Sequence, residues 1–185
     1  MLFTALQVSK DRGGSFLVRL YASPMRAGDF IGGYFFSMLI IAAAQLLICV
    51  VCSFIISLIT GVELSLGRLL LSAVVLIPSA ALLIGFGMLF GSIFSDKAAP
   101  GLCSVLISLG SMLGGVFMDV EGLGGVLLDI SRVLPFYHCV KTARCVIAGD
   151  YSGFLPSMLV LLAYCAVIGF AAVFAFGRKM KADLN

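Results

Sequence analysis

Four long apolar runs constrain this chain more than any other feature of its sequence. They cover about residues 32–58, 69–93, 100–117 and 154–176. Each run is close to or above the length of about 20 residues that a helix needs to cross a bilayer. In a chain this short, only helices can satisfy the backbone hydrogen bonds within hydrocarbon. The sequence therefore predicts an all-α, polytopic membrane protein with about four full transmembrane helices.

The overall composition supports the same conclusion. Of 185 residues, 62% are hydrophobic and only 11% are charged, whereas a soluble domain is about half apolar and a quarter charged. Lipid must therefore solvate much of the surface, and the lipid bilayer is the first expected partner. The net charge of +3 is small, and nothing in it indicates nucleic acid as a partner.

The six cysteines do not indicate metal or redox chemistry. Cys49 and Cys52 form a C-x-x-C pair, but they lie within an apolar run that has no turn around them. Cys139 and Cys145 would stand about 9 Å apart along a helix axis, which is too far for a disulfide. We expect six free thiols and no metal site.

Residues 119–150 are too polar to span a membrane and too apolar for a plain loop. Pro135 divides them into two short helices, at about residues 125–133 and 136–148, and Gly149 is a typical C-terminal stop. Such a pair predicts a helical hairpin that dips into the outer leaflet. The candidate residues of this outer hairpin are Pro135, His138, Lys141 and Arg144.

The basic residues indicate the orientation. Cytoplasmic loops carry an excess of Lys and Arg. If the C-terminus is cytoplasmic, that side holds eight of the twelve basic residues, namely Lys10, Arg12, Arg19, Arg26, Lys97, Arg178, Lys179 and Lys181. The opposite side then holds Arg68, Arg132, Lys141 and Arg144. We expect a multi-pass protein of the cell (inner) membrane whose C-terminus lies in the cytoplasm.

Small residues and proline mark the expected contacts between spans. Gly87-x-x-x-Gly91 and Gly110-x-x-x-Gly114 are typical of closely packed helices in lipid. Pro78, together with Gly85, makes the second span bendable. Charged residues are essentially absent from the span centres, which argues against ion-coupled carriers and proton pumps.

Known catalytic motifs are missing from the sequence. It contains no G-x-x-x-x-G-K-[ST] phosphate loop, no G-x-S-x-G and no H-E-x-x-H. The single histidine, His138, cannot build a metal site alone, and a helix-surface position is the favoured interpretation. The residues thus predict a membrane protein with no catalytic centre and no cofactor of its own.

A short amphipathic stretch precedes the first long run. On a helix, residues 15–23 place Phe16, Leu17, Leu20 and Tyr21 on one face, opposite Ser15, Arg19, Ala22 and Ser23. Gly13-Gly14 loosen its entry, and Pro24 closes its exit. The stretch is either an interfacial helix in the lipid headgroups or a docking element for a cytoplasmic partner.

Three segments carry a family resemblance. "KDRGGSFLVRLYASPMRAGDFIGGYF", "FGMLFGSIFSDKAAPGL" and "GGVFMDVEGLGGVLLDISRVLPFYHCVKTARCVIAGDY" follow one another in the chain. They resemble the first cytoplasmic loop, the turn between the fourth and fifth spans, and the outer hairpin of ATP-binding-cassette type-2 exporter permeases. The resemblance covers about residues 8–180. The hairpin departs from the commoner family phrase, since "GGVFMDV" lacks a proline before the acid.

The resemblance implies the organisation of the chain. Residues 1–9 would end a preceding helix, and the first span and most of the second would lie outside this sequence. The remaining parts would be a cytoplasmic coupling loop (10–30), three spans (31–118), the outer hairpin (119–150), the last span (151–178) and a cytoplasmic tail (179–185).

The resemblance also implies partners and a function. Cytoplasmic ATPase subunits, which carry ATP and Mg, would bind beneath the spans, and a second permease copy or a sister permease would pair with this chain. The residues that receive the ATPase would be Phe16, Leu17, Arg19, Leu20, Tyr21 and Pro24. The cargo would be hydrophobic or amphipathic, of the drug, lipid or polysaccharide class. The alternatives are a non-transporting membrane scaffold and an intramembrane enzyme.

Overall fold

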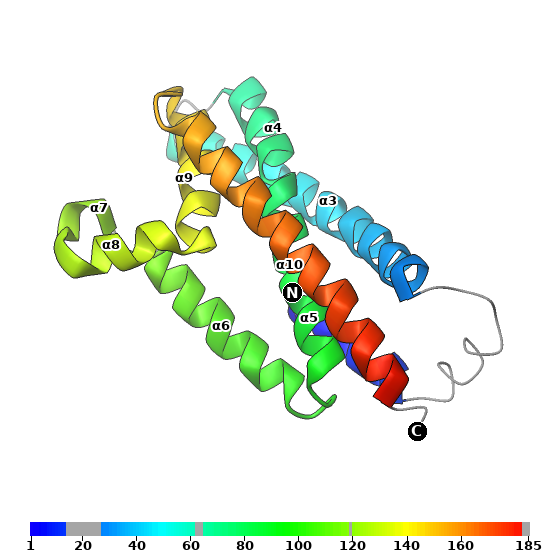
Figure 1. Ribbon diagram of the computed structural model, residues 1–185. Coiled ribbons are helices and arrows are strands. Elements are labelled where there is room, and N and C mark those ends of the chain that lie inside the picture. Colours follow the sequence, from blue (N-terminus) through cyan, green and yellow to red (C-terminus); the bar gives the residue numbers. More distant parts are fainter. Residues whose placement is uncertain (14–26, 62–64, 119, 183–185) are drawn as a thin grey trace. The chain divides into compact units, whose positions relative to one another are not determined.

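The computed structural model describes residues 1–13, 27–61, 65–118 and 120–182 (Figure 1). The regular elements in these ranges are helices, and none of the described residues lies in a strand, so the all-α prediction is confirmed. The helices are α1 (Leu2–Gly13), α3 (Ala27–Thr60), α4 (Leu66–Val75), α5 (Ile77–Ile93), α6 (Ala99–Leu113), α7 (Val120–Leu123), α8 (Gly125–Val133), α9 (Pro135–Ala148) and α10 (Phe154–Ala182).

Within the described ranges, three stretches are long and apolar enough to cross a membrane. They are Ile31–Thr60, Leu66–Ile93 and Phe154–Arg178. The first ends at Thr60, two residues beyond the predicted end, and Gly61 adopts a left-handed φ of 70° directly after it. The fold is that of a polytopic membrane protein, as the sequence predicts.

The remaining predicted span is shorter than expected. Residues 100–117 were expected to form one helix, but α6 has 15 residues and ends at Leu113. The amide of Val116 bonds to the carbonyl of Ser111 at 3.1 Å, and that of Gly115 to Met112 at 3.3 Å. Gly115 has a φ of 78°. This pattern is a Schellman motif, in which a left-handed glycine ends the helix and satisfies its last carbonyls.

The second span contains an interruption. Its two parts, α4 and α5, meet at Leu76, two residues before Pro78. Proline has no amide proton, so the regular bond to the carbonyl four residues earlier is missing there. Bonds from Leu76 to Ser72 and from Ala80 to Leu76, each 2.9 Å, bridge the interruption. The predicted bend site at Pro78 thus adjoins the interruption, whereas α5 continues unbroken through Gly85.

The described helices form two compact units. The first contains α1, α3 up to Leu39, α5 from Ala81, α6 up to Ser108 and α10 from Cys165. The second contains the rest of these helices together with α4, α7, α8 and α9. Each unit has its own core.

The first unit is packed around α1. Ala5, Ala99 and Cys103 are fully buried together, and Met1, Phe90 and Phe94 pack against them. The core of the second unit joins α3 to α4 through Val50, Leu69 and Ala73, with Leu46 and Phe54 beside them. Helices α4 and α9 also pack side by side in this unit (Figure 1).

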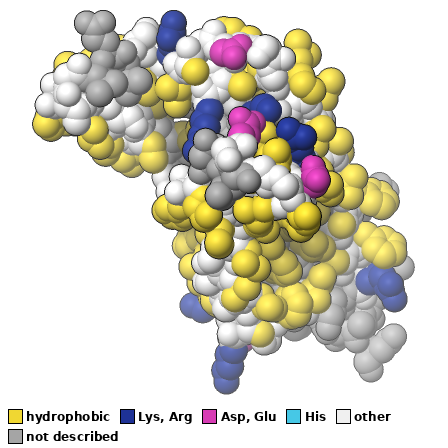
Figure 2. Space-filling view, turned by 90° about the vertical axis from the view of Figure 1, so that its left-hand side faces the viewer, with side chains coloured by type: hydrophobic (Ala, Val, Ile, Leu, Met, Phe, Trp, Pro, Cys, Tyr) yellow, Lys and Arg dark blue, Asp and Glu magenta, His cyan; other side chains and the backbone are white. Residues whose placement is uncertain are grey.

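Much of the apolar surface is uncovered. Only 6% of the most apolar stretch of α3 is buried, compared with 33% in the span formed by α4 and α5. Figure 2 shows a face on which hydrophobic side chains predominate and charged side chains gather in small groups. In a bilayer, lipid tails or further protein helices cover such surfaces.

Candidate functional site

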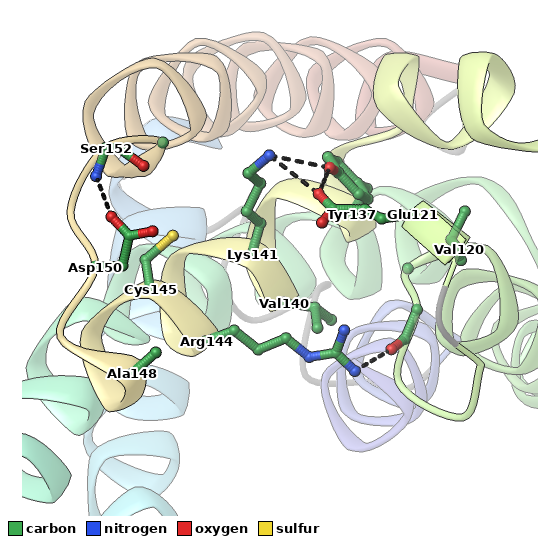
Figure 3. A pocket seen from close by; sticks show the side chains of 13 residues that line it. Val120, Glu121, Tyr137, Val140, Lys141, Arg144, Cys145, Ala148, Asp150 and Ser152 are labelled. Carbon is green, nitrogen blue, oxygen red and sulfur yellow. Dashed lines mark hydrogen bonds and ion pairs between the residues drawn. The ribbon is translucent and has the colours of Figure 1, made fainter. Parts of the chain in front are cut away.

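A cavity of about 340 Å³ lies in the second unit (Figure 3). Its walls come from the turn after α6, from α7, from one face of α9 and from the connection between α9 and α10. Tyr137, Lys141 and Arg144 line it from α9, and Glu121 lines it from α7. Their spacing of four and three residues places the α9 side chains on one helix face.

Local sequence signals set the position of α9. Leu134 is extended, and Pro135 begins the helix, where its missing amide proton causes no loss. At the other end, Asp150 bonds to the carbonyl of Cys145 at 3.1 Å, and Gly149 has a φ of 77°. This second Schellman motif ends α9 where the sequence predicted a stop. The predicted bounds of the two hairpin helices, 125–133 and 136–148, agree with α8 and α9 to within one residue.

Three side chains form a polar network on one wall of the cavity. The Tyr137 hydroxyl donates a hydrogen bond to Oε1 of Glu121. Nζ of Lys141 lies 3.2 Å from the same oxygen and 3.1 Å from the Tyr137 hydroxyl oxygen. It also lies 5.3 Å from the centroid of the Tyr137 ring, within range of a cation–π contact. This network joins α7 to α9.

The network shifts the charge equilibria of both ionisable partners. The hydrogen bond from Tyr137, followed by that from Lys141, holds the pKa of Glu121 below its ordinary value. The hydrogen bond to Tyr137, followed by that to Glu121, raises the pKa of Lys141. Both shifts favour the charged forms, so the pair is ionised at neutral pH.

Arg144 connects α9 to the turn after α6. Its Nη2 donates a 2.6 Å hydrogen bond to the carbonyl oxygen of Gly115. Figure 3 shows the side chain reaching along the cavity toward that carbonyl. The ion pair found among the described residues is Lys141–Glu121, so the charge of Arg144 has no carboxylate partner in that part of the chain.

His138 lies outside the cavity wall. Its Nε2 is 2.9 Å from the carbonyl oxygen of Arg132, and its ring stands edge-on to Tyr137. It therefore joins the start of α9 to the end of α8. Among the described residues, no group of three His, Cys, Asp or Glu side chains gathers as a metal site.

The two predicted glycine pairs face different neighbours. A Cβ added at Gly91 would lie 2.7 Å from the Ala5 carbonyl oxygen and 2.9 Å from Cβ of Val8, both in α1. A Cβ at Gly87 would lie 2.9 Å from Cβ of Thr4. The pair thus forms a glycine seam along which α5 meets the backbone of α1.

The other pair belongs to the second unit. A Cβ added at Gly110 would lie 2.9 Å from the ring of Phe136, and one at Gly114 would lie 3.1 Å from the Phe136 carbonyl oxygen. Gly110 and Gly114 therefore leave room for the first turn of α9 against α6.

The residues proposed to receive the ATPase lie outside the described ranges. Phe16, Leu17, Arg19, Leu20, Tyr21 and Pro24 all fall within residues 14–26, so their role stays a prediction. Sequence reasoning missed Glu121 and Tyr137. The Tyr137-x-x-x-Lys141 spacing was a usable signal, but the partner Glu121 comes from another element and leaves no local pattern.

The fold and this cavity define the class of protein. It is a polytopic helical membrane protein with a polar helical hairpin between two of its apolar segments. The model of the ABC-2 type transporter family matches residues 1–148. The chain belongs to this family. It is therefore a permease component of an ATP-binding-cassette transporter, the transport part and not the ATPase. Comparisons with curated proteins and with solved structures give no match.

Proposed function

We propose that the chain is the membrane subunit of an exporter that moves a hydrophobic or amphipathic cargo, of the drug, lipid or polysaccharide class, out of the cytoplasm. The observation that carries this proposal is the family match over residues 1–148 in a sequence that has no phosphate loop of its own. ATP and Mg would therefore bind a separate cytoplasmic subunit. The match supports such a partner, and a second permease copy or a sister permease would complete the pathway.

Energy would enter through residues 15–23. A partner can shift a conformational equilibrium only if it binds the two states with different free energies. The apolar face formed by Phe16, Leu17, Leu20 and Tyr21 would supply the contact, Arg19 would add a polar bond, and Pro24 would fix the end of the element. This assignment places the segment and the C-terminus on the cytoplasmic side of the cell (inner) membrane.

The hairpin α8–α9 would close the exit of the pathway. Its polar ties to α7 and to the turn at Gly115 give it defined contacts on both sides. Pro135 and His138 would hold the two helices of the hairpin at their junction, and Lys141 and Arg144 would fasten α9. A cargo that leaves would have to pass a surface fastened by a few hydrogen bonds, which can break and re-form.

The coupling assignment is tested by the double substitution Arg19→Glu with Leu20→Asp. We expect the protein to insert normally, while cargo-stimulated ATP hydrolysis of the purified complex falls to its basal rate. The control is Lys97→Glu, which reverses one charge, as Arg19→Glu does, in the loop between α5 and α6. Normal stimulation in the double variant would refute the assignment of residues 15–23.

A further inference from the structure

A polar contact joins the two helices that flank the proposed coupling segment. The hydroxyl of Tyr34, in α3, donates a hydrogen bond to Oδ2 of Asp11, in α1. The same oxygen accepts a 3.1 Å bond from Nε2 of Gln7, one turn earlier in α1. Asp11 and Tyr34 are both half-buried. All three residues belong to the first unit.

The position of this contact in the sequence gives it its importance. Asp11 lies two residues before the end of α1 at Gly13, and α3 begins at Ala27. Tyr34 lies seven residues into α3, which is about 10 Å of helix. The contact therefore links the helix that leads into residues 14–26 with the helix that leads out of them.

The other contacts of α1 are of a different kind. Along Gly87 and Gly91 its backbone meets α5 at close range, and Ala5 is buried against α6. Those contacts are apolar and steric, and they hold α1 within the first unit whatever happens at α3. The Tyr34 hydroxyl, in contrast, bonds to side chains of α1, namely Asp11 and Gln7, and such polar contacts are directional.

We propose that Asp11 and Tyr34 are positioning residues for energy coupling: their hydrogen bond makes α1 and the start of α3 respond together to a force on residues 14–26. The role in coupling rests on the proposed function, whereas the tie itself does not. Without the bond, α1 stays fixed to α5 and α6, and a push on the segment moves α3 alone. Binding of the ATPase is unaffected in this account, because neither residue lies in the docking element.

Three variants separate this role from general stabilisation. Tyr34→Phe keeps the ring and removes the donor, whereas Asp11→Asn keeps an acceptor oxygen for the hydroxyl. Ser37→Ala removes a 2.9 Å bond to the Gly33 carbonyl, one turn further along α3 and within that helix.

The first measurement uses the full chain alone in lipid nanodiscs and follows amide hydrogen exchange. We expect about tenfold faster exchange at residues 7–13 in Tyr34→Phe, since the hydrogen bond between α1 and α3 is lost. Exchange in Asp11→Asn and Ser37→Ala should stay near the wild-type rate at these positions. Unchanged exchange in Tyr34→Phe would refute the tie.

The second measurement uses the complex with its ATPase, trapped with ATP and vanadate. In the wild-type protein we expect trapping to change exchange at residues 7–13 and 27–39 together. In Tyr34→Phe the change should be confined to residues 27–39, and ATP hydrolysis should lose its dependence on cargo, with Asp11→Asn close to wild type.

The two proposals fail in different ways. A wild-type chain that retains no ATPase contradicts the proposed function, and the first measurement still decides the tie. A Tyr34→Phe complex that shows wild-type exchange changes and wild-type coupling overturns the positioning role.

Discussion

Different forces stabilise the interior of each of the two units of this protein. In the first unit, α1 packs on α5 along a glycine seam, and most of the contacts are between apolar groups or backbones. In the second unit, α9 is fastened to α7 and to the end of α6 by an ion pair, a tyrosine hydroxyl and an arginine. Burying apolar surface gains little in lipid, so close packing must hold the spans. The hairpin is more polar, and directional bonds hold it.

The largest effect is expected where two backbones touch. At Gly91, Gly91→Ala places a methyl group 2.7 Å from a carbonyl oxygen of α1, and overpacking of this kind costs about 1–3 kcal/mol. The matched change Gly101→Ala, in α6, meets no atom within 4 Å and gains up to about 1 kcal/mol of helix propensity. Thermal unfolding in mild detergent should therefore shift in opposite directions for the two variants. Equal shifts would show that the seam does not hold the first unit.

A smaller effect is expected at the corresponding pair in the second unit. The methyl group of Gly110→Ala meets the ring of Phe136 at 2.9 Å, and a side chain can yield more easily than a backbone. We expect a loss of about 1 kcal/mol in the same measurement. Adding Phe136→Leu should restore part of this loss, and no rescue would contradict the assigned contact.

Removing the hydrogen bond of Arg144 tests whether polar bonds stabilise the second unit. Arg144→Gln loses the 2.6 Å bond to the Gly115 carbonyl. Because Arg144 is exposed, we expect about 1 kcal/mol or less, seen as faster amide exchange at residues 115–123. Arg132→Gln, an equal change of charge on an exposed side chain of α8, should leave those amides unchanged. Equal effects of the two variants would assign the result to charge alone.

The smallest effect concerns pH. The pKa of Glu121 lies below its ordinary 4.5, so its contribution to stability is present above pH 4.5 and is lost as the pH falls through the lower, folded value. The pKa of Lys141 lies above its ordinary 10.5, so its contribution is present below pH 10.5 and is lost as the pH rises through the folded value.

Solvent screening keeps the pH effect below about 1 kcal/mol, because both side chains are partly exposed. Glu121→Gln should abolish the loss of hairpin stability at low pH, which is the acid limb of the stability profile. Amide exchange of α9 across pH measures it. Asp129→Asn, an exposed acid of α8, is the matched control and should retain that limb. An acid limb that persists in Glu121→Gln would place its origin elsewhere.

Local signals in the sequence were enough for much of the architecture. Pro135 begins α9 and Gly149 ends it, as predicted, because their backbone preferences act within a few residues. The end of α6 was missed, since Gly114 was interpreted as part of a packing pair and Gly115 was not recognised as a left-handed stop. The predicted bend of the second span adjoins Pro78, where α4 and α5 meet.

Contacts between distant segments could not be predicted from the sequence. The pairing of Asp11 with Tyr34 and that of Glu121 with Lys141 join separate helices, and no periodicity relates their positions. Tyrosine hydroxyls and single carboxylates in a membrane chain are usually interpreted one at a time. Their partners follow from how the helices pack, which a single sequence does not specify.

The central claim is that this permease works with a separate ATPase, and purification of the complex tests it most directly. The chain would be extracted from its native membrane in a gentle detergent and the retained proteins identified and quantified. We predict an equimolar ATPase that carries a G-x-x-x-x-G-K-[ST] loop. A chain that purifies intact with no such ATPase would contradict the account and favour a membrane scaffold.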